Sequence, residues 1–182
     1  MPASMPASLP IQTERLILRR PEMADAPALH HIASDERVAS TTASIPHPYP
    51  DDGAQEFIAA IRDNTDRDQL NLVIQIKGSD VIGMAGFRPH EGHVELAYMI
   101  GHAHWGHGYA TEAAHAIVRH VFANSLHDVI LARAMTRNPA SEAVIRKLGF
   151  RQTGVADVDV PMRGGVFTSS FWRLERADRH DG

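Results

Sequence analysis

The sequence contains no cysteine among its 182 residues. The chain therefore forms no disulfide, offers no thiolate ligand to a metal ion and has no cysteine nucleophile. An excess of basic residues is also missing, because 18 Lys and Arg stand against 22 Asp and Glu and give a formal net charge of -4. A broad basic surface for nucleic acid is thereby excluded, although a local basic pocket for a phosphorylated ligand is not.

Long apolar runs are absent as well. No stretch of the sequence approaches the roughly 20 apolar residues of a membrane span. The first ten residues, "MPASMPASLP", form a short tandem repeat without the basic residues or the apolar core of a secretory signal. We therefore expect residues 1–12 to be a flexible leader and residues 13–182 to be one domain of a cytoplasmic protein, with neither nucleic acid nor membrane as a partner.

Apolar spacing predicts the order of the secondary structure. Alternation with period two indicates strands, and apolar residues at i, i+3, i+4 and i+7 indicate helices. The expected strands are 13–21, 70–76, 81–87, 93–101, 128–135, 151–158 and 167–175, and the expected helices are 22–33, 55–63, 110–122 and 138–149.

One strand–helix–strand unit stands out at residues 93–135. A helical crossover returns the chain in the same direction, so this unit implies a parallel pair in an otherwise antiparallel sheet. The sequence thus predicts a single α+β domain with a mixed, mostly antiparallel seven-stranded sheet and about four flanking helices.

The stretch "GHAHWGHGYATEA" (residues 101–113) joins the end of the expected strand 93–101 to the next expected helix. Glycines there allow a sharp turn and a close approach of the backbone to a ligand. The first amides of the helix have no partner inside it, and the helix dipole favours an anion. Several successive amides suit a pyrophosphate better than a single carboxylate.

The same stretch contains His102, His104 and His107, so a metal site is the alternative. Three imidazoles would have to converge across the turn at Trp105 and Gly106, and no cysteine or nearby Asp completes the set. Structural zinc takes four protein ligands and catalytic zinc three well-oriented ones. The phosphate interpretation is therefore preferred, and we expect no metal.

The motif "HWGHGYATEA" resembles the acetyl-CoA-binding motif of the GNAT superfamily, Gln/Arg-x-x-Gly-x-Gly/Ala. Trp105 takes the Gln/Arg position, Gly108 the central Gly and Ala110 the last position. Tryptophan departs from the strict pattern and is similar to the branch of ribosomal-protein N-acetyltransferases. The segments "TERLILRRP", "VELAYMIG" and "NPASEAVIRKLGF" resemble that branch in the same order, so the likeness runs from about Thr13 to Glu175.

This resemblance implies a GNAT-like fold with acetyl-CoA as cosubstrate and also allows a homodimer. The two strands of the parallel pair would splay apart, and the pantetheine arm would lie between 93–101 and 129–135. Backbone amides of Met99 or Ile100 would then hold the pantetheine and the thioester carbonyl. The pyrophosphate would lie on the cofactor-binding turn, formed by His104, Trp105, Gly106, His107, Gly108, Tyr109 and Ala110.

Transfer to an amine needs a base for the amine proton and an acid for the leaving thiolate. Glu95, an acidic residue inside an apolar strand beside the expected gap, is the candidate base, and an outward-facing Glu is the plain alternative. His93 lies on the same face by alternation and is the second candidate. Tyr98 lies on the other face and would need a bulge to reach the site.

The resemblance places Asn138 and Ser141 beside the thiol. The family uses these positions to contact CoA or to protonate the sulfur, although Asn138 also fits a plain helix cap. Ser141 is the candidate that hydrogen-bonds the thiolate or relays a proton to it.

The expected acceptor is a primary amine, on a peptide N-terminus or on a small molecule. It would enter between residues 22–63 and the hairpin "PMRGGVFTSS", where Tyr49, Asp51 and Asp52 are placed to attract a cation. The resembled branch often carries an Asp where this chain has "VFTSS", so the same acceptor is not implied. The expected activity is an acetyl-CoA-dependent N-acetyltransferase, with a non-catalytic acyl-CoA sensor or a His-ligated metalloprotein as alternatives.

Overall fold

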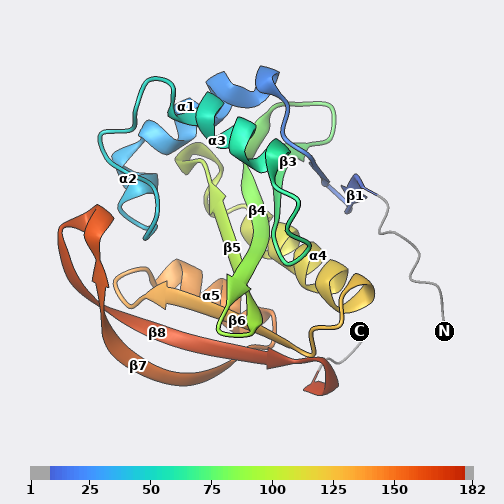
Figure 1. Cartoon of the computed structure of the whole chain (residues 1–182), viewed down its shortest axis with the longest axis vertical. Helices are drawn as coiled ribbons and strands as arrows, with labels where there is room; N and C mark the ends of the chain where they lie inside the picture. The colour runs from blue at the N-terminus through green and yellow to red at the C-terminus, as the bar shows by residue number, and fades with distance from the viewer. Residues whose placement is uncertain (1–8, 179–182) are drawn as a thin grey trace.

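Eight strands form one sheet in the computed structural model, which describes residues 9–178 (Figure 1). The strand order is β1-β2-β3-β4-β5-β6-β8-β7. The strands are β1 (Ile11–Gln12), β2 (Leu16–Arg19), β3 (Leu70–Ile76), β4 (Val81–His90), β5 (His93–Ile100), β6 (Val129–Met135), β7 (Arg151–Val160) and β8 (Gly165–Glu175).

Helices cover both faces of this sheet (Figure 1). Residues of α4 (Tyr109–Asn124) and α5 (Pro139–Lys147) join the larger apolar core on one face. On the opposite face, α1 (Ala26–Ser34) and α3 (Gly53–Asp63) pack against Val73 and Met84, and we call this the α3 face. The short helix α2 (Glu36–Ala39) follows α1. None of the described helices is long and apolar enough to cross a membrane.

The parallel pair predicted from the crossover is β5 with β6. These strands pair only at Val94–Ile130 and Glu95–Leu131, although both run on for several residues. Beyond Glu95 the two strands separate, which confirms the predicted splay. β8 continues the sheet on the far side of β6, antiparallel to it, and β7 forms its edge.

The structure corrects the sequence prediction in several local details. The sheet has eight strands rather than seven, because Ile11–Gln12 pairs with β2, and the ordered domain thus begins before residue 13. Residues 1–8 of the expected leader lie outside the described residues. The short helix α2 was not predicted, because four residues are too few for a periodic pattern. Strand β4 ends at His90, three residues later than predicted, and the β4–β5 turn that follows consists of Glu91 and Gly92, both with positive φ.

Candidate active site

A cavity of about 1040 Å³ opens where β5 and β6 separate. On one side it is lined by the turn after β5 and by the starts of α4 and α5. On the other side it reaches the α3 face, the loop between α2 and α3, and strand β8. The cavity therefore connects the glycine-rich turn with the side of the sheet where an acceptor was expected.

The direction of the β5 backbone groups decides which amides face this cavity. Gly101 N–H donates to Ile82 O at 2.8 Å, so this position faces β4. Backbone groups alternate along an antiparallel strand, and those of Met99 therefore also face β4, whereas those of Tyr98 and Ile100 face the gap. Of the two predicted amide donors, Ile100 is placed for a ligand. Met99 lines the cavity without offering its amide.

Trp105 takes part in holding the end of this strand. Its indole Nε1 donates to Ile100 O at 2.7 Å. The carbonyl that β6 leaves unpaired is therefore capped by the side chain that departs from the Gln/Arg pattern. The ring also packs against His102, with ring centroids 4.8 Å apart.

The glycine-rich turn presents free amides to the cavity. Gly106 and Gly108 have φ of 77° and 79°, and α4 begins directly after Gly108. A Cβ added at Gly106 would meet nothing within 4 Å, so the space beside the turn is open. The amides of His104 and Trp105 donate within the turn, to Gly101 O and His102 O. His104 and Trp105, two of the residues predicted to hold the pyrophosphate, therefore do not offer their amides to a ligand. The free amides of the turn run from Gly106 into the first turn of α4.

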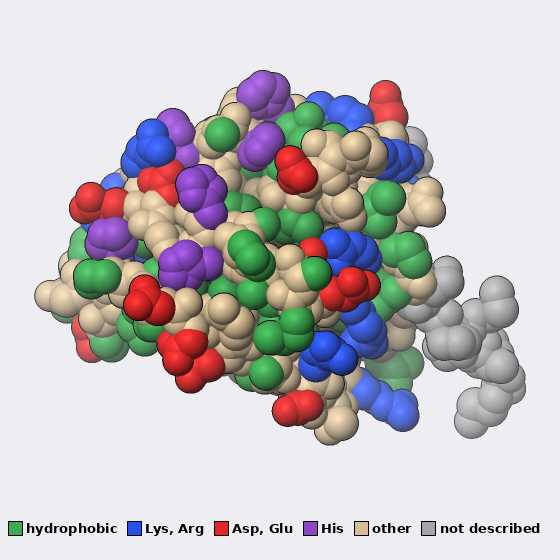
Figure 2. Space-filling view, turned by 90° about the horizontal axis from the view of Figure 1, so that it is seen from above, with side chains coloured by type: hydrophobic (Ala, Val, Ile, Leu, Met, Phe, Trp, Pro, Cys, Tyr) green, Lys and Arg blue, Asp and Glu red, His purple; other side chains and the backbone are tan. Residues whose placement is uncertain are grey.

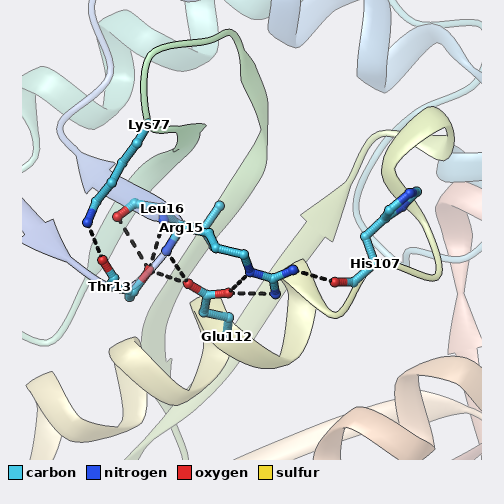
Figure 3. A network of polar contacts seen from close by, with 6 residues as sticks. All are labelled: Thr13, Arg15, Leu16, Lys77, His107 and Glu112. Atoms are coloured by element: carbon cyan, nitrogen blue, oxygen red, sulfur yellow. Dashed lines mark hydrogen bonds and ion pairs between the residues drawn. The ribbon is translucent and has the colours of Figure 1, made fainter.

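A network of polar contacts fixes this turn to the start of the sheet (Figure 3). Glu112, in the first turn of α4, accepts from Thr13 Oγ1 at 2.6 Å and from Arg15 N and Nε at 2.9 and 2.7 Å. Arg15 also donates to His107 O at 2.9 Å and lies over the Tyr109 ring. Burial alone would raise the pKa of Glu112, but the hydrogen bonds from Thr13 and Arg15 outweigh it and hold that pKa below its usual value.

The three histidines of the turn do not converge. His102 packs on Trp105, His107 stacks on Tyr109 and contacts Trp105 O through Nδ1, and His104 lines the cavity. Figure 2 shows histidine side chains as separate patches among other residues. Within residues 9–178, no group of three or more His, Asp or Glu side chains could hold a metal ion. The metal interpretation therefore has no support in the described part of the chain.

A tyrosine–serine pair lies on the other face of β5. Tyr98 Oη and Ser141 Oγ are 2.8 Å apart, and Asn138 Oδ1 accepts from Ser141 N at 3.2 Å. The helix cap predicted at Asn138 is thus confirmed. Burial raises the pKa of Tyr98 to about 12, against the weaker opposing effect of the hydrogen bond with Ser141. Tyr98 reaches α5 with no register shift between β4 and β5, so the expected bulge is not needed.

Glu95 is buried on the α3 face, with 4% of its surface exposed, and it lines the cavity. Arg88 donates to Glu95 Oε2 through Nε and Nη2 at 2.9 and 2.7 Å. Arg133 Nε lies 3.8 Å from the other oxygen, Oε1. His93 pairs with His90 at the hairpin end of β5 and is not among the residues that line the cavity. The structure therefore places Glu95, and not His93, beside the gap.

The acceptor side differs from the sequence expectation in its charge. Tyr49 lines the cavity, whereas Asp51 and Asp52 are exposed and do not. Arg163 lies at the tip of the β7–β8 hairpin and donates to Thr42 O and Ile45 O. These hydrogen bonds hold the tip against the α2–α3 loop. Sequence reasoning also missed Arg88 and Arg133, although their positions on the same face as Glu95 follow from strand alternation once the register is known.

Comparisons with known proteins agree with this geometry. A family model for the acetyltransferase (GNAT) domain matches residues 15–151. An uncharacterized N-acetyltransferase of Bacillus licheniformis, p20, is 32% identical over 151 residues, which cover 80% of this chain and 84% of the relative.

Solved structures of acetyltransferases share the fold. The ribosomal-protein-S5-alanine acetyltransferase of Vibrio fischeri superposes with a TM-score of 0.78 at 17% identity, covering 94% of this chain and 98% of its own. The spermidine N-acetyltransferase of Vibrio cholerae, solved with CoA and spermine, has a TM-score of 0.78 at 17% identity, covering 91% and 98%. At this identity the two structures support the fold and leave the acceptor open.

Glu112→Gln tests the network that fixes the turn. The amide cannot accept the same charge-assisted hydrogen bonds, so the free energy of unfolding should fall by about 1–3 kcal/mol at pH 7. The folded-state pKa of Glu112 is lowered, so the contribution of its carboxylate is present above the unfolded value of 4.5 and is lost as pH falls through the lower folded value. Thermal unfolding of both proteins between pH 7 and 4 should therefore show a gap that narrows below about pH 4.5.

Glu142→Gln is the matched control, because Glu142 stands in the first turn of α5 without a side-chain hydrogen bond to any described residue. An equal loss of stability in both variants at pH 7 would contradict the role given to the network.

Proposed function

The chain belongs to the GNAT family of acetyltransferases, and we propose that it transfers an acetyl group from acetyl-CoA to a primary amine. The observation that carries this proposal is the opening of β5. One cavity receives the gap-facing amides of Tyr98 and Ile100, the free amides at the start of α4 and the hydroxyl of Ser141. These groups match, in order, the pantetheine arm, the pyrophosphate and the sulfur of an acyl-CoA.

The donor is held largely by backbone groups in this proposal. The N-terminus of α4 favours a doubly charged pyrophosphate because amides and helix dipole act together. The amide of Ile100 binds the thioester carbonyl, which becomes more electrophilic. The same donor stabilises the oxyanion of the tetrahedral intermediate, an effect worth roughly 3–4 kcal/mol when well placed.

The chemical step is a direct attack. The neutral amine nitrogen forms a bond to the acetyl carbon, and the carbonyl pair moves onto oxygen. When the carbonyl re-forms, the carbon–sulfur bond breaks, and the products are the N-acetyl compound and CoA. One proton must leave the nitrogen and one must reach the thiolate.

Two groups of the chain serve these protons in our proposal. Glu95 takes the amine proton through Oε1, directly or through water, because Arg88 occupies Oε2. Ser141 hydrogen-bonds the thiolate and passes it a proton, while Tyr98, which stays protonated at neutral pH, donates to the serine. The acceptor is a peptide N-terminus or a small-molecule amine. A homodimer and a cytoplasmic location remain predictions from sequence.

Gly108→Val tests whether the glycine-rich turn binds the pyrophosphate of acetyl-CoA. Saturating acetyl-CoA at about 100 times Kd should stabilise the wild type by roughly 2.7 kcal/mol, which for this chain length is a rise in Tm of about 5–11 °C. A β-branched residue at a φ of 79° distorts the turn, so the variant should show no such rise. Thermal unfolding with and without acetyl-CoA, in buffer containing EDTA, measures the rise in Tm of the wild type and of the variant.

Gly78→Val is the control, because Gly78 has a φ of 73° and lies in the β3–β4 turn, outside the cavity lining. It should lose about as much intrinsic stability as Gly108→Val and keep the full ligand shift. Retained acetyl-CoA binding in Gly108→Val would disprove the proposal that the glycine-rich turn binds the pyrophosphate.

Glu95→Gln tests the base. The amide still accepts a hydrogen bond from Arg88 but takes no proton, so kcat at neutral pH should fall by about 10²-fold. The thermal shift with acetyl-CoA should stay within error of the wild type. Steady-state kinetics on one amine give kcat, and an unchanged kcat would reduce Glu95 to a structural ion pair.

Ser141→Ala and Tyr98→Phe test the acid side. Each should lower kcat by about 10- to 100-fold because the thiolate then leaves without its hydrogen-bonded proton donor. The double variant should lose little more than the worse single one, since the two hydroxyls act as one unit. Additive losses would show that the residues act separately.

A further inference from the structure

One arginine on the α3 face lines the cavity without a partner at hydrogen-bond distance. Arg133 belongs to β6, and its side chain is 25% exposed. Its nearest acidic atom is Glu95 Oε1, 3.8 Å from Nε, and within residues 9–178 its guanidinium makes no hydrogen bond. A guanidinium carries five N–H donors and is costly to withdraw from water unpaired. Its donors are therefore available to a ligand in the cavity.

The neighbourhood of Arg133 favours an anion. Arg88, also on the cavity wall, already neutralises the buried Glu95 through two hydrogen bonds. The other acidic residue of the lining is Glu56, which is exposed, whereas Asp51 and Asp52 lie outside it. A polycation would meet two arginines here and little uncompensated negative charge.

Strand β8 adds a hydroxyl to the same wall. Ser169 is 2% exposed, lines the cavity and makes no side-chain hydrogen bond to a described residue. The register pairs Met135 with Ser169 and Arg133 with Phe171. Arg133 and Ser169 are therefore diagonal neighbours on one face of the sheet, at a separation that a small ligand spans.

The rest of this wall is apolar. Ile45, Phe57, Met84 and Met135 contribute to it, together with Tyr49. A ligand that fits such a wall has an apolar body with one or two charged groups at one end.

We propose that the acceptor is a primary amine that carries a carboxylate, as an α-amino acid does, with Arg133 binding the carboxylate and Glu95 facing the amine. This inference rests on the proposed acetyl transfer and names the substrate class of that site. The separation of 3.8 Å between Arg133 and Glu95 is too long for a hydrogen bond, so each retains capacity for a ligand. Arginine binds a carboxylate through two parallel hydrogen bonds, which also fix its orientation.

The test compares acceptors that differ only in the carboxylate. L-Phenylalanine is set against L-phenylalaninamide, a peptide amide that begins with Asp against one that begins with Asn, and spermidine serves as an amine without an anion. Release of CoA is followed with a thiol reagent, which reads CoA alone because the chain has no cysteine. The amide has a less basic amine, so the readout is the ratio of kcat/KM values within a pair, compared between wild type and variant.

The wild type should prefer the carboxylate member of at least one pair, and the pair that responds identifies a free amino acid or an acidic peptide as the source. In Arg133→Gln, kcat/KM for that member should fall about 10- to 100-fold, mostly through KM. For its amide partner the change should stay below about threefold. Arg133→Lys keeps the charge without the paired hydrogen bonds and should fall between the two, and it replaces Arg133→Gln if that variant does not fold.

Arg173→Gln is the matched control, because Arg173 lies on the neighbouring strand β8, bonds Glu175 and is absent from this cavity's lining. It should leave the ratio unchanged. A carboxylate-to-amide ratio of kcat/KM that is the same in the wild type and in Arg133→Gln for both pairs would overturn the carboxylate inference and leave the acetyl transfer standing. Absence of turnover with every amine, with acetyl-CoA shown to bind by thermal shift, would overturn the acetyl transfer and the inference together.

Discussion

The separation of β6 from β5 after Glu95 is the constraint on which the site depends. A strand inside a sheet has both rows of backbone groups paired, and an unpaired row away from water is costly. Here β4 pairs with β5 as far as Ile100, whereas β6 leaves it after Glu95. Trp105 satisfies the last carbonyl, and the amides that remain open can donate to the carbonyls of a ligand in the cavity. The pantetheine arm of an acyl-CoA carries such carbonyls, so the gap in the sheet fits the proposed donor.

Charge is distributed unevenly around this gap although the whole chain is acidic. The glycine-rich turn combines free amides with Arg15, whose charge is shared with Glu112, so the turn is fixed and still favours an anion. Among the described residues that line the cavity, Arg88 and Arg133 outnumber the one buried carboxylate, Glu95. The net charge of -4 therefore says little about either end of the cavity.

Sequence reasoning recovered the features that depend on neighbours along the chain. The turn between strand and helix, the cap at Asn138 and the parallel crossover all follow from residues close in sequence. Contacts between distant segments could not be predicted in this way. Arg15 and Glu112 lie 97 residues apart, and no pattern in either segment indicates that the two residues are in contact. The choice between the Met99 and Ile100 amides depends on a single register, which the sequence leaves free.

The alternation of β5 separates the two substrates and also joins them. Tyr98 and Ile100 direct their side chains to the core that α4 and α5 cover and their backbone groups to the gap, where the proposed donor lies. Glu95 and Met99 belong to the α3 face, where the proposed acceptor lies. Between them stands Ala97, exposed in the cavity wall and carrying only a methyl group. In the proposed function, the strand therefore holds the donor in the gap and the acceptor on the α3 face, and the small side chain of Ala97 between them leaves room for an amine to reach the thioester.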